Sequence, residues 1–231
     1  MPIGLLLCDH LDPDVVEQVG DYTELFPAAF GPAGVDLRVY DVTVGEFPGS
    51  LDECDGWIVS GSRRSAYEDE GWIHELSELI VRLVEEQRRT VGICFGHQLI
   101  AQALGGTVER AEVGWGVGVQ RFELVEHPEW IDPERDSFTL LMSHRDQVTK
   151  LPEGAQVVAT AGYCPVGAYR IGEHVFCVQG HPEFVPQLSS ILMRKRREVM
   201  GDSVVDAGLI SLDGPIDSAR MIDWMANFLG V

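Results

Sequence analysis

The chain has 231 residues, 45% of them hydrophobic, and carries a formal net charge of −20 at pH 7. This length and composition predict a soluble globular protein with one large core, and no apolar run approaches the roughly 20 residues needed to cross a membrane. Because the negative charge repels phosphates, nonspecific nucleic-acid binding is not expected.

Strand-like and helical patterns alternate in the first part of the chain. Residues 3–8 read as a buried first strand without the basic region or cleavage site of a signal peptide, which predicts a cytoplasmic protein. Helical stretches run to about residue 30, strand-like ones cover residues 35–40 and 56–59, and residues 72–88 form a long amphipathic helix. This alternation predicts an α/β fold with a single doubly wound, mostly parallel sheet flanked by helices.

The next strand, over residues 90–93, leads directly into Cys94, and residues 99–104 have the spacing of a helix. Cys94 therefore lies on a turn from strand to helix, flanked by Gly92 and Gly96, as the nucleophile of a hydrolase does. The N-terminus of the helix behind it favours a thiolate. The alternative is a small buried thiol in the core, which is the usual place of a free cysteine.

The second half of the chain begins with a glycine-rich stretch, residues 107–125, over which we expect hairpins. The remaining expected strands are 138–142, 156–161, 166–171 and 175–178, and the expected helices are 185–200, 204–209 and 217–229. Asp217 is expected to cap the last helix. No linker or repeat is visible, so we interpret residues 1–231 as one domain with a small antiparallel excursion.

The segment after the last expected strand supplies the partners that a thiol nucleophile needs. His181 can take a proton and return it, and Glu183 can orient the imidazole. Only Pro182 separates them, so on an extended segment their side chains project to the same side. Open α/β sheets build their sites at strand ends of this kind, which predicts that the pair meets Cys94 at one crevice.

Three segments together resemble the class I glutamine amidotransferase family. Residues 92–98 (Gly-Ile-Cys-Phe-Gly-His-Gln) and 180–184 (Gly-His-Pro-Glu-Phe) match in order, and residues 142–146 (Met-Ser-His-Arg-Asp) are similar to the Ser-His-x-Asp segment of the glutaminase domain of GMP synthases. The resemblance implies a flavodoxin-like fold to about residue 190, with extra helices after it. It also implies hydrolysis of the side-chain amide of glutamine through a γ-glutamyl thioester, without a cofactor.

The resemblance also assigns roles to individual residues. Cys94 is the expected nucleophile, His181 the base and acid, and Glu183 the residue that orients it. The backbone N–H of Phe95 is one expected oxyanion donor. The residues expected to hold the α-substituents of glutamine are Gln98, Ser143 and His144, the last two through their backbone.

The loop after the third expected strand departs from the family pattern. Where Gly-Gly-Pro usually supplies the second oxyanion donor, residues 60–64 are Ser-Gly-Ser-Arg-Arg. A backbone N–H of Gly61 or Ser62 can still serve, but without the proline we expect a looser loop. Arg63 and Arg64 either meet a substrate carboxylate or keep the loop solvated, and we favour the second.

The cysteines and one basic cluster indicate whether a metal site or a docking patch for a partner is expected. Five scattered cysteines with no Cys-x-x-Cys or His-x-x-x-His pair argue against a disulfide framework and against a structural zinc site. Residues 194–197 (Arg-Lys-Arg-Arg) interrupt the acidic chain. We favour a solvated helix end over a docking patch for a partner, because a helix C-terminus stabilises cations.

Three functions remain open from the sequence. The first is a glutaminase subunit that passes ammonia to a separate synthase, since the chain has no Ser-Gly-Gly-x-Asp-Ser segment like that of the ATP pyrophosphatase portion of GMP synthase. The second is a self-contained hydrolase of γ-glutamyl peptides or amides, and the third is a noncatalytic binding protein. The intact Cys94, His181 and Glu183 disfavour the third, and the match to GMP synthases leans slightly toward the first.

Overall fold

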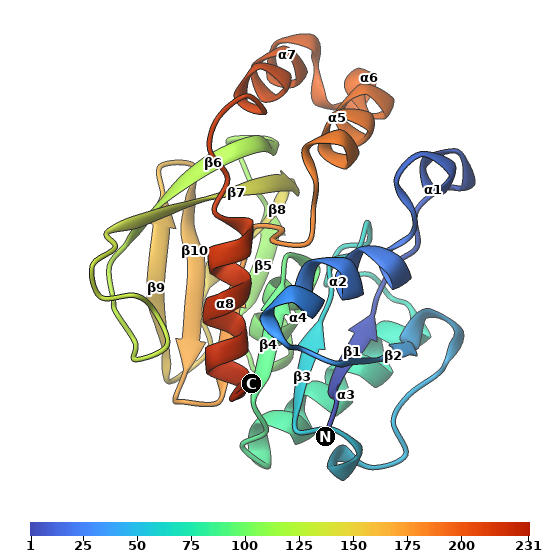
Figure 1. Cartoon of the computed structure of the whole chain (residues 1–231), viewed down its shortest axis with the longest axis vertical. Coiled ribbons are helices and arrows are strands. Elements are labelled where there is room, and N and C mark those ends of the chain that lie inside the picture. The colour runs from blue at the N-terminus through green and yellow to red at the C-terminus, as the bar shows by residue number, and fades with distance from the viewer.

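A nine-stranded sheet runs through the computed structural model, which describes residues 1–231. The strand order is β2-β1-β3-β4-β11-β10-β9-β6-β7 (Figure 1). Its strands are β1 (Ile3–Leu7), β2 (Leu37–Asp41), β3 (Gly56–Val59), β4 (Thr90–Ile93), β6 (Gly116–Leu124), β7 (Ser137–His144), β9 (Ala155–Ala161), β10 (Cys164–Ile171) and β11 (Val175–Val178). Strands β5 (Thr107–Arg110) and β8 (Asp146–Lys150) form a separate antiparallel pair.

The large sheet has a parallel part and an antiparallel part. Strands from β2 to β11 in the order above pair in parallel, and strands from β11 to β7 pair antiparallel. Every residue of β1, β3, β4 and β11 is buried, as expected for strands that are covered on both faces. This confirms the predicted doubly wound, mostly parallel sheet between helices with an antiparallel part.

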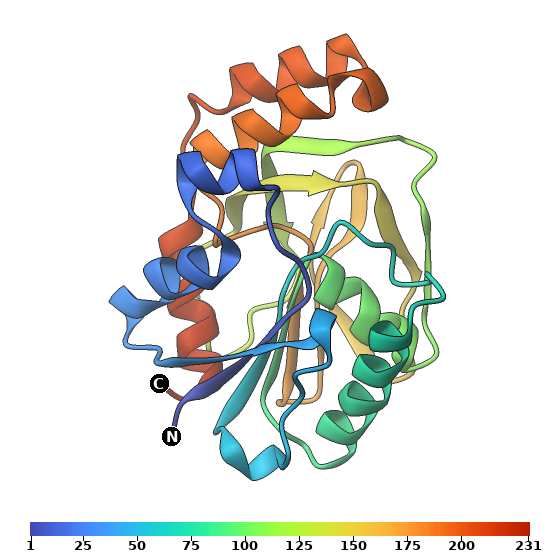
Figure 2. The same ribbon diagram turned by 90° about the vertical axis from the view of Figure 1, so that its right-hand side faces the viewer.

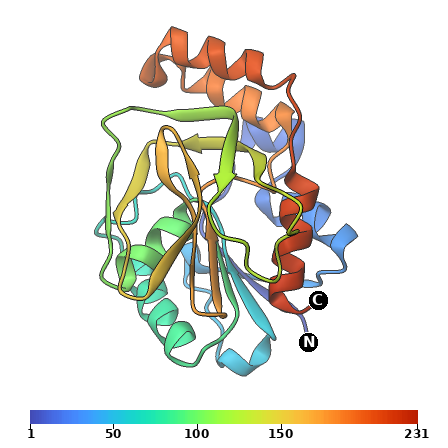
Figure 3. The same cartoon turned by 90° about the vertical axis from the view of Figure 1, so that its left-hand side faces the viewer.

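Helices cover both faces of the parallel strands. Helices α2 (Tyr22–Phe30) and α8 (Ser218–Leu229) lie on one face, and α3 (Gly71–Glu85) and α4 (Phe95–Ala103) on the other (Figures 2 and 3). An apolar cluster fills each face of the sheet, a larger one against α2 and α8 and a smaller one against α3 and α4. In β1, Leu5 and Leu7 pack into the larger cluster and Leu6 into the smaller one, because successive side chains of a strand point to opposite faces. None of the helices is long and apolar enough to cross a membrane.

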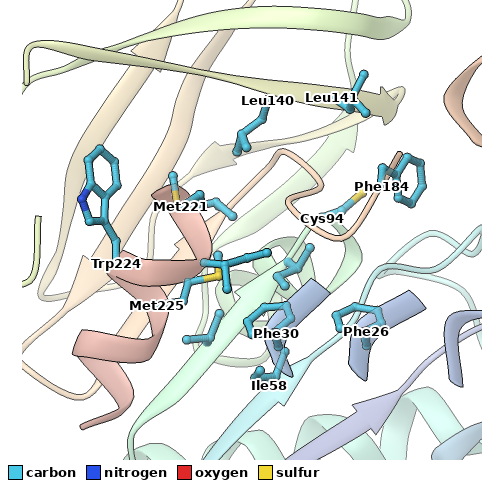
Figure 4. Packing of buried hydrophobic residues seen from close by; sticks show 14 of the residues in the cluster. Phe26, Phe30, Ile58, Cys94, Leu140, Leu141, Phe184, Met221, Trp224 and Met225 are labelled. Carbon is cyan, nitrogen blue, oxygen red and sulfur yellow. The ribbon is translucent and has the colours of Figure 1, made fainter. Parts of the chain in front are cut away.

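The larger apolar cluster extends from α8 to the strand ends of the parallel part. The side chains that Figure 4 shows packed between α2, α8 and the sheet include Phe26, Phe30, Ile58, Met221 and Met225. Cys94 and Phe184 belong to the same cluster and lie on its side away from α8 (Figure 4). The residue expected to be the nucleophile therefore borders the core.

Three helices near the C-terminus stand above the antiparallel end of the sheet (Figure 1). These are α5 (Pro186–Lys195), α6 (Arg197–Met200) and α7 (Asp202–Ser211). A small apolar cluster joins them to β6 through Val117, Met193, Met200 and Val205. Helix α1 (Pro13–Val19) lies beside α5, and Lys195 donates to the carboxylate of Asp14 at 2.7 Å.

Residues 107–125 do not form the expected hairpins. Strand β5 pairs with β8, whereas β6 pairs with β7 and β9. The connection between β5 and β6 includes Gly114 at a φ of 87°, and it carries the chain from one sheet to the other. The sequence does not signal β8, because no glycine or proline separates it from β7. Alternating side chains mark a strand but do not identify its neighbour.

Two helix starts also differ from the prediction. Helix α4 begins at Phe95 rather than near residue 99, so no linker separates it from Cys94. Helix α8 begins at Ser218, and Asp217 stands at the N-cap position before it, but the carboxylate of Asp217 does not cap the helix. It accepts instead from the backbone N–H and the hydroxyl of Thr139, at 2.9 and 3.1 Å, and so ties α8 to β7.

Gly118 in β6 is a position at which α7 leaves no room for a side chain. Its φ is 69°, and a Cβ there would lie 2.6 Å from the carbonyl oxygen of Gly208 in α7. We expect Gly118→Ala to lower the free energy of unfolding by about 1–3 kcal/mol, because backbone strain and the clash act together. Urea unfolding followed by circular dichroism measures this loss.

Gly114 provides the matched control for this substitution. It has a similar φ of 87°, but a Cβ there would meet no atom within 4 Å. Gly114→Ala should therefore cost less stability than Gly118→Ala. Equal losses in the two variants would mean that the close approach of α7 contributes nothing to the loss of stability in Gly118→Ala.

Candidate active site

Cys94 lies on a strained turn between β4 and α4. Its φ is 52° and its ψ is −98°, a conformation that persists only where the surrounding structure enforces it. Its backbone N–H donates to the carbonyl oxygen of Val178 at 2.9 Å. A Cβ on Gly96 would lie 2.3 Å from the carbonyl oxygen of Val59, so only glycine lets α4 start this close to β3.

Three strand ends bring their loops to one edge of the sheet. Strands β4 and β11 pair in parallel, with Val178 opposite Ile93, so the segments that follow them start side by side. Gly61 follows β3, and a Cβ on it would lie 2.9 Å from Cε1 of His181 and 3.7 Å from Cβ of Cys94. Cys94, His181 and Gly61 therefore meet at the carboxyl edge of the sheet, where α/β proteins bind ligands.

The imidazole of His181 is held between a carboxylate and an aromatic ring. Its Nδ1 lies 2.7 Å from Oε1 of Glu183, and the two side chains are only 5% and 1% exposed. The ring of Phe184 stacks on it with 3.9 Å between centroids. The segment forms a turn rather than the expected extended stretch, and the N–H of His181 donates to the carbonyl of Leu141 at 2.9 Å. The turn is what brings the two side chains together.

The charge of His181 depends on its buried neighbours. Burial is the largest single effect and lowers the pKa, but attraction to Cys94 and Glu183 outweighs it, so the pKa of His181 lies above its usual value. Its Nε2 is buried and has no hydrogen-bond partner in the chain. The arrangement favours an imidazolium close to the sulfur, and an imidazolium can protonate a leaving amine.

Hydrogen bonds tie the start of the loop after β3, although this loop lacks the proline. The hydroxyl of Ser60 accepts from the N–H of Cys8 at 2.9 Å and donates to the carbonyl of Gly61 at 3.0 Å. The carbonyl of Ser60 accepts from the N–H of Gly96 at 3.1 Å. Hydrogen bonds of Ser60 thus hold the start of the loop, and the looseness expected without the proline stays a prediction.

The backbone donors expected for an oxyanion are unused within the chain. The N–H groups of Gly61 and Ser62 donate to no other residue. That of Phe95 belongs to the first turn of α4, where a helix leaves its N–H groups without intrahelical partners. These groups are the candidates for stabilising negative charge on an oxygen bound next to Cys94.

A cavity of about 620 Å³ opens beside Cys94. The predicted site residues that line it are Ser62, Cys94, Gln98, Ser143 and His144, whereas Gly61, Phe95, His181 and Glu183 do not. The other lining residues, which were not expected in the site, include Tyr22, Arg110, Trp115, Arg145, Lys195 and Arg196. Three of these carried a sequence signal, because Arg145 lies inside the matched segment 142–146, and Lys195 and Arg196 lie inside the basic cluster 194–197.

Gln98 and His144 are fixed by the same backbone carbonyl. Nε2 of Gln98 donates to the carbonyl of Asp146 at 2.8 Å, and Nδ1 of His144 lies 2.9 Å from that oxygen. Burial, and then the charge of His181, lowers the pKa of His144 to about 4, so its imidazole is neutral. Since Nδ1 donates, the buried Nε2 is an acceptor, and it has no partner in the chain.

The two arginines after Gly61 serve the loop itself. Nε of Arg63 lies 3.0 Å from the carboxylate of Asp9, and Nη1 of Arg64 lies 3.2 Å from that of Glu68. Both side chains also line the cavity. They are ion-paired rather than merely solvated, which refines the interpretation favoured from the sequence.

The basic cluster 194–197 is more than a solvated helix end. Lys195 and Arg196 line the cavity, while Arg197 pairs with Asp206 of α7 at 2.7 Å. Arg194 and Lys195 are exposed in the last turn of α5, as the favoured interpretation has it, but the sequence did not indicate that this helix end also borders the cavity. No group of three His, Cys, Asp or Glu side chains stands close enough to hold a metal ion.

Comparisons with known proteins agree with the motifs. The family model described as "Glutamine amidotransferase class-I" matches residues 15–197. Gamma-glutamyl peptidase 3 of Arabidopsis thaliana is 35% identical over 178 residues, which are 74% of this chain and 72% of that protein. The glutamine-hydrolyzing GMP synthase subunit of Archaeoglobus fulgidus is 29% identical over 170 residues, 73% of this chain and 87% of the archaeal protein.

Solved structures share the fold. A glutamine amidotransferase from Thermotoga maritima superimposes with a TM-score of 0.78 and 18% identity, over 100% of both chains. A second one, from Methylobacillus flagellatus, gives 0.75 and 18% over 99% of this chain and 93% of that one. At such identity the likeness concerns the architecture alone.

Cys94 is expected to be the first thiol to react in the folded protein. Burial is the main cause that raises the pKa of Cys8, Cys164 and Cys177 to about 12, whereas Cys94 lines the cavity. Brief treatment with iodoacetamide followed by peptide mass spectrometry should find label on Cys94 alone. The Cys94→Ala protein is the control, and equally fast labelling of that variant would contradict the assignment.

Proposed function

The chain belongs to the class I glutamine amidotransferases, and we propose that it is a self-contained γ-glutamyl peptide hydrolase with Cys94 as its nucleophile. It is an enzyme of the glutaminase type, since its relatives include γ-glutamyl peptidases and glutamine-hydrolyzing GMP synthases. The chain spans about seven-tenths of the length of the Arabidopsis peptidases that it matches. The particular substrate and the roles of the residues below are the proposal.

The proposed reaction proceeds in two halves. The sulfur of Cys94 attacks the γ-carbonyl carbon, and N–H groups at Gly61, Ser62 and Phe95 stabilise the oxygen that becomes negative. The carbon–nitrogen bond breaks, the imidazolium of His181 gives its proton to the leaving amine, and a γ-glutamyl thioester remains. Neutral His181 then takes a proton from water as the water oxygen attacks the thioester. Glutamate leaves, and the thiolate and imidazolium are restored.

The size of the cavity is the observation that favours peptide hydrolysis over simple glutamine hydrolysis. Its volume of about 620 Å³ lies within the roughly 300–1,000 Å³ of pockets that bury drug-sized ligands. Ammonia, the leaving group of glutamine, needs almost none of this space. A peptide as the leaving group gives the outer part of the cavity an occupant.

The hydrogen bonds that tie the start of the loop after β3 support activity without a partner. An ammonia-donating subunit should keep its site poorly formed until the synthase docks, because it otherwise wastes glutamine. Here Ser60 ties the loop to Cys8 and Gly96, and Glu183 already orients His181. A site held in this way favours a hydrolase that acts alone.

A glutaminase subunit that serves a separate synthase is the second candidate. Its support is the likeness to the GMP synthase subunit of Archaeoglobus fulgidus, of which the chain covers 87%, together with the segment 142–146. In that case the outer cavity would receive part of the partner rather than a peptide.

Steady-state kinetics on the purified chain distinguish the two candidates. Glutamate and ammonia are quantified after incubation with glutamine or with γ-glutamyl dipeptides, and Cys94→Ala gives the background. We expect the dipeptides to be hydrolysed with a kcat/KM at least about tenfold above that of glutamine, since remote contacts of the leaving group add binding energy. Turnover of glutamine alone, or only after a synthase is added, would reverse the assignment.

Replacing His181 should cost more activity than replacing Glu183. His181→Ala removes the group that protonates the leaving amine, whereas Glu183→Gln leaves an imidazole with a weaker orienting partner. We expect a loss of about 1,000-fold or more in kcat for the first and a smaller loss for the second. A Glu183→Gln protein less active than His181→Ala would require the roles to be reassigned.

The pH profile adds a readout that a purely structural defect would not move. The raised pKa of His181 keeps its side chain protonated at pH values above the usual pKa of a histidine. The kcat/KM should therefore fall on the alkaline side only once the pH exceeds this raised pKa. Glu183→Gln removes one of the charges that raise this pKa. The alkaline limb should therefore shift to lower pH in that variant, and an unchanged limb would mean that Glu183 does not act on the imidazole.

A further inference from the structure

Three arginines line the cavity without a carboxylate partner. Arg110 ends β5, Arg145 stands between β7 and β8, and Arg196 stands between α5 and α6. Nη1 of Arg196 donates only to the hydroxyl of Ser143, at 3.3 Å. Nε of Arg145 is buried and has no hydrogen-bond partner in the chain. An unpaired guanidinium next to a cavity is a ready site for an anion.

The other cations of the cavity are already neutralised. Arg63 and Arg64 pair with carboxylates of their own loop and its neighbours, and Lys195 contacts both Asp12 and Asp14. Among the lining carboxylates only Asp146 has no cation partner; it accepts from the hydroxyl of Ser65 and lies opposite Arg110 in the β5–β8 pair. Arg110, Arg145 and Arg196 therefore outnumber the unpaired carboxylates of the cavity and leave a net positive charge for a ligand. They come from three separate parts of the chain, so the fold gathers them at one place.

The γ-glutamyl group alone does not explain this excess of positive charge. At neutral pH its α-ammonium and α-carboxylate groups cancel. A peptide with a free C-terminus adds one uncompensated carboxylate on the leaving side of the scissile bond. In a chain with a net charge of −20, such an anion is repelled unless local cations receive it.

We propose that Arg110, Arg145 and Arg196 bind the carboxylate of the leaving group, so that the enzyme selects γ-glutamyl peptides that end in a free carboxylate. This inference rests on the proposed γ-glutamyl peptide hydrolase activity and names its substrate class. The guanidinium groups hold the leaving part while Cys94 attacks the other end. They act as specificity determinants and leave the chemistry to the residues at the strand ends.

A pair of substrates of equal size tests the proposal. One is a γ-glutamyl dipeptide with a free C-terminal carboxylate, and the other is the same dipeptide with a C-terminal amide. We expect the wild-type protein to prefer the acid by about 10- to 100-fold in kcat/KM, the range of a charge-assisted hydrogen bond. The preference should shrink at high salt, because ions screen the attraction.

Single substitutions assign the effect to the arginines. Arg110→Gln, Arg145→Gln and Arg196→Gln should each lower kcat/KM for the acid more than for the amide, and so reduce the preference. Arg194→Gln is the matched control, because Arg194 lies in the same basic cluster but does not line the cavity. It should keep the wild-type preference.

Each other outcome has a definite meaning. Equal hydrolysis of acid and amide by the wild type would overturn the arginine proposal while the peptide hydrolase proposal stands. Hydrolysis of neither would remove both. Variants that lose the same factor on both substrates would show that the arginines bind the α-carboxylate or support the fold, which also overturns the proposal.

Discussion

The close approach of α4 to β3 is the constraint on which the candidate site depends. At Gly96 the helix backbone comes so near the carbonyl of Val59 that a single methyl group would overlap it. This contact lets Cys94 keep a positive φ and lets the N–H of Gly96 reach the carbonyl of Ser60. The sulfur, the helix N-terminus and the loop after β3 are therefore positioned together, and a larger residue at this one position would separate them.

Two electrostatic environments adjoin this turn. The inner one is buried in the core, where Glu183 and His181 are tolerated because each partner offsets the desolvation of the other. The outer one is the cavity, where guanidinium groups stand in an acidic protein. In the proposed reaction the inner pair sets the protonation state of the imidazole, whereas the outer cations bind the group to which the γ-glutamyl group is attached. Under this proposal, reaction and substrate choice reside in different layers of one site.

Much of this arrangement could be predicted from the sequence, and the failures have physical reasons. The parallel strands were predictable because each is short, apolar and followed by a helix, and Cys94, His181 and Glu183 stood at recognisable strand ends. The pairing of β5 with β8 was not predictable, because the alternation of polar and apolar side chains marks a strand but does not identify its neighbour. The cavity wall was missed because the direction of a charged helix end depends on packing: Arg196 reads as solvated until α5 is docked.

Under the proposed function, the docking of α5 shapes the part of the cavity that receives the leaving group. On one side its helical hairpin with α7 is fastened to β6 by Val117, Met193 and Val205, an apolar contact that excludes water. On the other side Lys195 reaches α1 through exposed ion pairs, which are weak because water and salt screen them. The wall is therefore anchored more firmly at β6 than at α1. Relatives that keep the strand ends and change this wall would keep the chemistry and change the leaving group.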